Sequence, residues 1–192
     1  SSKDIHACIC GIDAEQKVKV ISSKVINNTP KGFEILIAWI EKNRKQKDIP
    51  LVIGMEATGI YHEECAYYLH DKKYSVCVVL PNYAKKFLQA SGLKSKNDKI
   101  DAKGLAQMFA ERAFALWVPM DKFYYHLRAL TRQQESLQEI KTSVVNQRSA
   151  AKRSAFINKE VIKQLNETIK FSEKKIAEIE KKIITHLKSN KE

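Results

Sequence analysis

Four acidic residues have the types and spacing needed for metal-dependent chemistry. Asp13 and Glu56 each directly follow an apolar run of strand length, and Asp98 and Asp101 lie about one turn apart if a helix begins there. Functional groups gather at the carboxyl ends of strands in an open parallel sheet. If the two strands are neighbours, the four carboxylates can form an oxygen-only site suited to Mg²⁺ or Mn²⁺. A pair of such ions stabilises the attacking and leaving oxygens of a phosphodiester displacement.

Each of these acids also has a purely structural explanation. Asp13 could close a turn after a strand, and Glu56 could be a surface acid. Asp98 and Asp101 could be first-turn acids that interact with the positive end of a helix dipole. Both explanations stay open for each residue taken alone, but the joint placement of the four acids favours a metal site.

Basic residues surround the second pair of acids. They are candidates for contacts to a nucleic-acid backbone: Lys94, Lys96, Lys99 and Lys103. The whole chain has 34 Lys and Arg residues against 22 Asp and Glu residues, which gives a formal net charge of +12. Such a balance indicates a polyanionic partner. In the C-terminal part of the chain, however, a basic helical face could equally be a solvated surface.

The elements that must position the acids alternate between strands and helices. Strands are expected at residues 5–12, 51–55 and 76–80, with one or two more within 17–26. Helices are expected at residues 60–72, 82–90 and 98–111, and one more begins at Thr29-Pro30. Thr58 is placed to cap the helix at 60–72. The order of elements predicts an α/β fold with parallel βαβ units in residues 1–120.

Residues 121–192 are expected to be nearly continuous helix, because glycine is absent after Gly104 and proline after Pro119. Apolar residues form two heptad-like stripes on either side of a polar break near residues 149–154. The stripes are Leu127, Leu130, Leu137 and Val144, then Ile162, Leu165, Ile169, Ile176, Ile179 and Ile183. They predict an antiparallel helical hairpin or a dimerising coiled coil. Interruptions at Gln134, Lys141 and Ser172 indicate a modest seam.

Other kinds of site have weaker support. The four cysteines lie in apolar segments without a C-x-x-C pair, which argues against a zinc site or a disulfide framework and favours a reduced, cytosolic protein. His62 could be a further ligand beside Glu56, or a helix-start residue. No apolar stretch approaches about 18 residues and no signal-peptide pattern is present, so no membrane segment is predicted.

Three segments resemble the DEDD transposases of the IS110 insertion-sequence family, which also includes the Piv-type DNA invertases. They are Gly11-Ile12-Asp13, residues 54–62 (GMEATGIYH) and residues 96–102 (KNDKIDA). The resemblance implies a RuvC-like, ribonuclease H-like domain with a mixed sheet flanked by helices, followed by a coiled coil. It also implies that Asp13, Glu56, Asp98 and Asp101 are catalytic acids that bind Mg²⁺ or Mn²⁺.

The same resemblance implies partners. Family members are DNA recombinases guided by a structured RNA, so DNA, a guide RNA and a homo-oligomer formed through the coiled coil are expected, in the bacterial cytoplasm. The family's C-terminal domain with a nucleophilic serine is expected to be absent, because no serine of the helical tail (Ser149, Ser154, Ser172, Ser189) matches a nucleophile motif. The chain should therefore bind Mg²⁺ and nucleic acid without completing strand exchange.

Two other functions remain compatible with the sequence. One is a stand-alone RuvC-like nuclease or Holliday-junction resolvase that uses the same carboxylates. The other is a non-catalytic RNA-binding and oligomerisation module in which the acids only cap helices and close turns.

Overall fold

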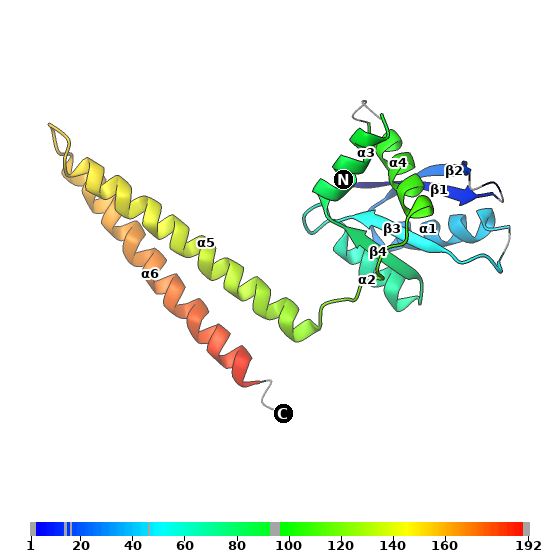
Figure 1. Ribbon diagram of the computed structural model, residues 1–192. Coiled ribbons are helices and arrows are strands. Elements are labelled where there is room, and N and C mark those ends of the chain that lie inside the picture. Colours follow the sequence, from blue (N-terminus) through cyan, green and yellow to red (C-terminus); the bar gives the residue numbers. More distant parts are fainter. Residues whose placement is uncertain (1–2, 14, 16, 46, 93–96, 190–192) are drawn as a thin grey trace. The chain divides into compact units, whose positions relative to one another are not determined.

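The computed structural model describes residues 3–13, 15, 17–45, 47–92 and 97–189. The chain divides into two compact units, Ser1–Pro119 and Met120–Glu192 (Figure 1). Unit 1 contains β1 (Asp4–Ile12), β2 (Val18–Asn27), α1 (Pro30–Asn43), β3 (Val52–Glu56), α2 (Glu63–Asp71), β4 (Ser75–Val79), α3 (Pro81–Ala90) and α4 (Asp98–Glu111). Unit 2 contains α5 (Lys122–Ala151) and α6 (Lys159–Lys188). The order of strands and helices confirms the predicted α/β class.

The strands of unit 1 pair in two ways. β1 and β2 form an antiparallel hairpin from Asp4 opposite Asn27 to Ile12 opposite Val18, and the register shifts by one residue between Ile9 and Cys10. β3 and β4 are parallel, as the βαβ pattern predicts. Within the described residues, these pairs are separate two-stranded sheets and not the one mixed sheet that the resemblance implies. Hydrophobic patterning predicts which residues form strands and which face is buried, but it does not specify the neighbour of each strand.

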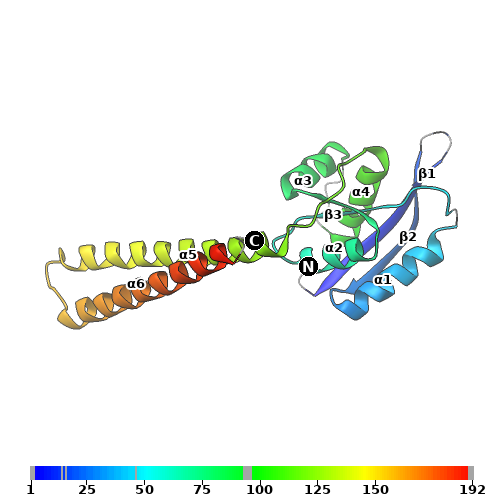
Figure 2. The same ribbon diagram turned by 90° about the horizontal axis from the view of Figure 1, so that it is seen from below.

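Helices cover both faces of the strands (Figure 2). On one face, the largest core cluster joins α1 and α2 to the strands, with Phe33 and Leu69 fully buried. The odd-numbered side chains of β1, such as Ile5 and Ile9, pack against this cluster. On the other face, a second cluster joins α3 and α4 around the fully buried Met108. The two clusters fix the helices that carry or neighbour the candidate acids.

The predicted helix starts are confirmed where the capping signal is local. The Thr29 hydroxyl accepts from Gly32 N at 3.2 Å at the start of α1. Asn97 Oδ1 accepts from Lys99 N at 2.9 Å at the start of α4. The predicted cap at Thr58 is wrong, because α2 begins later and its N-cap is His62. The Thr58 hydroxyl instead donates to Glu56 Oε1 at 3.1 Å.

A glycine allows α4 to lie directly on β3. A Cβ atom added to Gly54 would overlap the Phe109 ring, with several ring carbons closer than any normal contact. The half-buried Phe109 therefore occupies the space that a side chain at residue 54 would need. This contact ties the helix that carries Asp98 and Asp101 to the strand that ends in Glu56.

Unit 2 is the antiparallel helical hairpin, the first of the two predicted alternatives (Figure 1). Its seam contains the buried side chains of Val144, Ile169, Ser172 and Ile176. The polar interruptions of the stripes are satisfied: Gln134 donates to Glu180 at 2.9 Å, Lys141 pairs with Glu173 at 3.0 Å, and the Ser172 hydroxyl donates to Thr168 O at 3.0 Å. Within the described part of the chain, no helix is both long and apolar enough to cross a membrane.

Candidate functional site

Asp13 lies in the turn between β1 and β2. Its Oδ1 accepts from the Lys17 amide at 2.8 Å, and its Oδ2 pairs with Lys19 Nζ at 2.9 Å. The hydrogen bond from Lys19, followed by that from the Lys17 amide, holds the pKa of Asp13 below its usual range. Asp13 is therefore a carboxylate in a turn that already holds a cation, which is the structural role considered for it from the sequence.

Glu56 is the last residue of β3, opposite Val79 of β4, and it is half-buried. One carboxylate oxygen accepts the Thr58 hydroxyl at 3.1 Å. The chain after it is held by a bond from the Ala57 amide to Val79 O at 2.8 Å. The carboxyl group thus lies at the carboxyl end of a parallel strand, as predicted.

Asp98 is the first residue of α4 and lies beside the strand hairpin. Its Oδ2 is 3.6 Å from Nε2 of His6 on β1, and its side chain is 69% exposed. The other ring nitrogen of His6, Nδ1, is buried without a hydrogen-bond partner among the described residues. A small hollow of about 160 Å³ adjoins this pair and is lined by His6, Ala7, Ser23, Lys24, Val25, Lys99 and Ala102.

Asp101 follows one turn later on α4 and is half-buried. Its backbone amide donates to Asn97 O at 2.9 Å, which is a normal first-turn bond. Its carboxylate makes no hydrogen bond or ion pair with any other described residue, in contrast to Asp13, Glu56 and Asp98. Burial of a carboxylate without a hydrogen-bond or ion-pair partner is unfavourable. Of the four acids, Asp101 is therefore the one that local structure explains least.

The structure does not bring the four acids into one cage. Asp98 lies beside His6 near the start of β1, whereas Asp13 follows the end of that strand. Seven residues of extended strand separate positions 6 and 13 by roughly 20 Å. Ligands of one ion must all lie within about 2.6 Å of it. In the described part of the chain, no group of three or more His, Cys, Asp or Glu side chains could hold a metal ion. The four carboxylates, as the structure places them, cannot all be ligands of one metal ion.

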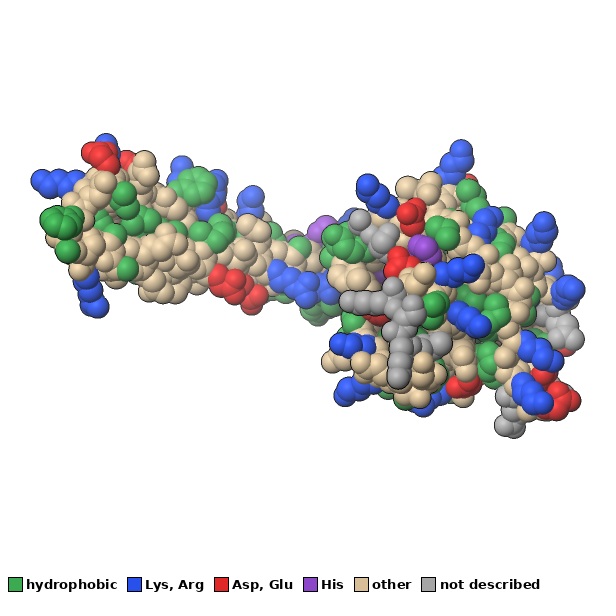
Figure 3. Space-filling view, turned by 90° about the horizontal axis from the view of Figure 1, so that it is seen from above, with side chains coloured by type: hydrophobic (Ala, Val, Ile, Leu, Met, Phe, Trp, Pro, Cys, Tyr) green, Lys and Arg blue, Asp and Glu red, His purple; other side chains and the backbone are tan. Residues whose placement is uncertain are grey.

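Two of the four candidate nucleic-acid contacts lie in the described part of α4. Lys99 and Lys103 are exposed, and Lys99 lines the hollow beside His6. Lys94 and Lys96 lie outside the described residues. In the space-filling view, Lys and Arg side chains are spread over the visible face of unit 1 with few acids between them (Figure 3). This surface suits a polyanion.

Sequence reasoning missed the residues that contact the acids. His6, Cys8 and Cys10 alternate along β1, and His6 lies at Asp98 and lines one hollow with Lys99 and Ala102, so this face of the strand lies beside α4. That period of two was visible in the sequence as a signal for a shared face. The pairing of Lys19 with Asp13 had no comparable signal, because it depends on the register of the β1–β2 hairpin.

Two known proteins are similar to this chain. The pilin gene-inverting proteins of Moraxella bovis and Moraxella lacunata are each 32% identical to it over 108 residues. The aligned stretch is 56% of this chain and 33% of each relative, so the chain spans about a third of the relatives' length. The similarity therefore concerns a part of those proteins.

A family comparison covers more of the chain. The DEDD transposases of the IS110 family match residues 1–157, a range that contains Asp13, Glu56, Asp98 and Asp101 together with all of unit 1 and α5. The match extends over well more than half of the 192 residues. The chain belongs to the IS110 family of DEDD transposases.

Proposed function

We propose that this chain is the catalytic N-terminal part of a DNA transposase or site-specific recombinase. The observation that carries the proposal is the family match over residues 1–157, which includes all four motif acids. The pilin gene-inverting relatives support it, because their name describes inversion of a DNA segment. The proposed fold of unit 1 is ribonuclease H-like, with the parallel β3–β4 pair and helices on both faces as support.

The proposed catalytic and metal-binding residues are Asp13, Glu56, Asp98 and Asp101, with Mg²⁺ or Mn²⁺ as the ion. Carboxylate oxygens are the donors that these ions prefer. Because Asp98 and Asp13 lie near opposite ends of β1, the proposal requires α4 to shift along the strand when the site assembles. The contacts of Asp98 with His6 and of Asp13 with Lys19 would be exchanged in that shift.

The proposed partners are DNA, a structured guide RNA and further copies of the chain, in the cytoplasm of a bacterium. The net charge of +12 supports a polyanionic partner. The proposed contacts to the nucleic-acid backbone are Lys94, Lys96, Lys99 and Lys103. The α5–α6 hairpin is the proposed oligomerisation segment, since it presents exposed apolar side chains such as Ile140 and Ile184.

Calorimetric titration with Mg²⁺ and Mn²⁺ tests this proposal. The wild type should bind the ion, and the double variant Asp98→Ala with Asp101→Ala should lose binding. Glu111→Gln at the other end of α4 is the matched control and should bind as the wild type does, because the Glu111 carboxylate accepts a hydrogen bond from Gln107 of its own helix at 2.7 Å and is not one of the four motif acids. Equal binding by the wild type and the double variant would refute the metal site.

One observation favours a second candidate function. Three of the four acids have hydrogen-bond or ion-pair partners within the protein: Asp13 accepts from the Lys17 amide, Glu56 accepts from Thr58, and Asp98 lies beside His6. This is the arrangement expected of a non-catalytic RNA-binding and oligomerisation module. That module predicts that neutralising Asp13 and Glu56 leaves both RNA affinity and recombination by a longer form of the protein unchanged.

A further inference from the structure

The loop between α5 and α6 presents an aromatic ring to solvent. Phe156 is 94% exposed, and the neighbouring Ile157 and Val161 are 56% and 43% exposed. We call residues 152–163 the hairpin tip. Hydrophobic and basic side chains lie at this end of the hairpin on the visible face, with acidic atoms beside them (Figure 3). Such a group of exposed apolar side chains is a candidate interaction surface.

Hydrogen bonds fix the backbone that carries this ring. The Lys152 and Arg153 amides donate to the end of α5, each at 3.0 Å. The Ser154 hydroxyl lies 2.9 Å from Ala151 O and 3.0 Å from Phe156 O, so it can donate to either carbonyl. Asn158 Oδ1 accepts from the first amides of α6 at 3.0 and 3.2 Å. The loop is therefore shaped before any partner binds, which lowers the entropic cost of binding.

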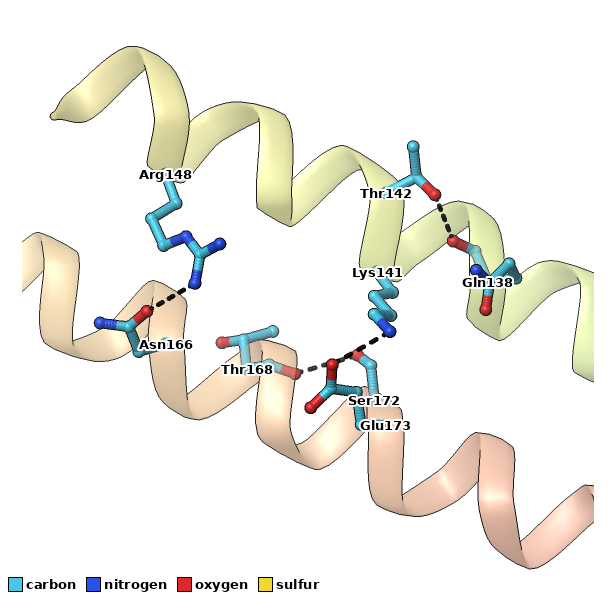
Figure 4. Close-up of polar contacts among 8 residues, drawn as sticks. All are labelled: Gln138, Lys141, Thr142, Arg148, Asn166, Thr168, Ser172 and Glu173. Atoms are coloured by element: carbon cyan, nitrogen blue, oxygen red, sulfur yellow. Dashed lines mark hydrogen bonds and ion pairs between the residues drawn. The ribbon is translucent and has the colours of Figure 1, made fainter. Parts of the chain in front are cut away.

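The charge around the ring is basic. From Ile140 to Lys159 the chain has five basic residues and no acidic one, and the one acid of the hairpin tip, Glu160, follows directly. Two of the five are used within the hairpin, since Lys141 pairs with Glu173 and Arg148 donates to Asn166 at 3.0 Å (Figure 4). The other three, Lys152, Arg153 and Lys159, make no ion pair with a described residue and lie beside Phe156 in the sequence.

An exposed aromatic ring beside unpaired cations matches the chemistry of unpaired nucleotides. A base stacks on the ring while the lysine and arginine side chains contact the phosphates on either side. A paired duplex offers phosphates but no free base face. We infer that the hairpin tip binds single-stranded nucleic acid, with Phe156 stacking on a base and Lys152 and Arg153 contacting the backbone. The inference rests on the proposed function, which supplies a nucleic-acid partner.

Fluorescence anisotropy of the full chain with a labelled oligouridylate and with a duplex DNA of the same length tests the stacking. Phe156→Ala should weaken oligouridylate binding about tenfold or more and leave duplex binding within about twofold. Phe171→Ala is the matched control, because Phe171 is a 59% exposed ring on α6 outside the tip. It should change neither affinity. Circular dichroism should show that both variants keep their helices.

The salt dependence of the same titrations tests the charges. Lys152→Gln with Arg153→Gln should lower the slope of log affinity against log salt by about 1.4, or about 0.7 for each lost phosphate contact on a single strand. Lys181→Gln with Lys182→Gln, two exposed lysines of α6 outside the tip, removes the same charge and should lower the slope less.

Three results would overturn the inference. The first is equal oligouridylate affinity for Phe156→Ala and Phe171→Ala. The second is an equal salt-dependence slope for the double variant at Lys152 and Arg153 and the double variant at Lys181 and Lys182. The third is displacement of the oligouridylate by polyglutamate with equal strength in the wild type and Phe156→Ala, which would assign the tip to an acidic protein partner. None of these results bears on metal binding by Asp98 and Asp101, so failure of the tip is distinguishable from failure of the proposed function.

Discussion

Asp13 illustrates how one carboxylate can close a turn and still be a candidate ligand. Its oxygens accept from the Lys17 amide and pair with Lys19, so the residue already sits in a site that stabilises a negative charge next to a cation. A divalent ion at this position must displace the Lys19 ammonium. Because the Lys19 side chain is 72% exposed, breaking this ion pair costs little free energy. The structural and the catalytic explanations of Asp13 are thus compatible.

Asp101 differs from the other three acids. It is half-buried, and its carboxylate has no hydrogen-bond or ion-pair partner among the described residues. The first turn of α4 does not need Asp101 as a cap, because Asn97 fills that role. Its position one turn from Asp98 was fully predictable from the sequence. The contact between Asp98 and His6 was not, because it depends on where α4 lies along β1.

Cys65 provides a residue-scale prediction about pH. Burial, followed by the charge of Glu64, raises the pKa of the Cys65 thiol to about 12. At pH 8 only roughly one molecule in ten thousand should carry the thiolate, against a substantial fraction at an unperturbed pKa of about 8.5. Alkylation of Cys65 by iodoacetamide should therefore be slow in the native protein and fast in urea, as measured by peptide mass spectrometry.

The sign of the linkage is fixed by the raised pKa. The folded state favours the neutral thiol, so this stability is complete below about pH 8.5 and is lost as the pH rises toward the folded value. The urea-unfolded sample is the internal reference for reactivity. Alkylation of native Cys65 at the unfolded rate at pH 8 would contradict the burial of this thiol.

At the scale of elements, the sequence predicts what is encoded within one segment. The strands and helices of unit 1 were predicted to within a few residues, and the starts of α1 and α4 follow from Thr29 and Asn97. The start of α2 was missed because the Thr58 hydroxyl bonds to Glu56, a competing acceptor that capping rules do not weigh. The partner of β1 was also not encoded locally, since in the described residues β1 pairs with β2 and not with β3.

The contact of β3 with α4 gives a prediction for element packing. Gly54→Ala should destabilise the protein by about 1–3 kcal/mol, because the added methyl group overlaps the Phe109 ring. In the double variant with Phe109→Leu, the smaller side chain should leave room for the methyl group. The loss should therefore be less than the sum of the two single losses. Urea unfolding followed by circular dichroism measures all four proteins.

Strict additivity of the two substitutions would contradict this packing. Gly92→Ala is a useful comparison, because a Cβ there meets no atom within 4 Å. Any loss in that variant reports only the positive φ of 73° at Gly92 and not overpacking.

The antiparallel register of the hairpin gives a second prediction. Lys141→Glu should destabilise unit 2 by about 0.5–1 kcal/mol, because it places a carboxylate opposite Glu173. Adding Glu173→Lys should restore most of the loss, since the pair is then reversed. Thermal unfolding of the helical signal measures the difference. A double variant no more stable than Lys141→Glu alone would argue against the pairing of these two residues.

At the scale of the whole molecule, charge is the property most clearly fixed by composition. A chain with a net charge of +12 should bind duplex DNA with an affinity that falls steeply with salt, by about 0.9 in logarithmic slope for each phosphate contact. Filter binding at several salt concentrations measures this slope. A slope near zero would show that the basic residues are only a solvated surface.

The proposed metal site also belongs to this scale, because its four acids come from different elements. The sequence predicted the four acids from motif and spacing, yet the structure holds Asp13 and Asp98 near opposite ends of β1. The relative position of β1, β3 and α4 depends on tertiary contacts and on any bound ion or nucleic acid, neither of which is visible in residue patterns. In our proposal, a shift of α4 separates the described arrangement from an assembled metal site.

Paramagnetic broadening by Mn²⁺ in NMR spectra of the isotope-labelled chain tests the shared metal site most directly. We predict that substoichiometric Mn²⁺, added in the presence of duplex DNA, broadens the amide signals beside Asp13, Glu56, Asp98 and Asp101 together. In Asp101→Asn, the broadening should weaken at all four positions, and in Glu111→Gln it should remain. Broadening confined to one end of β1, or unchanged in Asp101→Asn, would contradict a single site formed by the four acids.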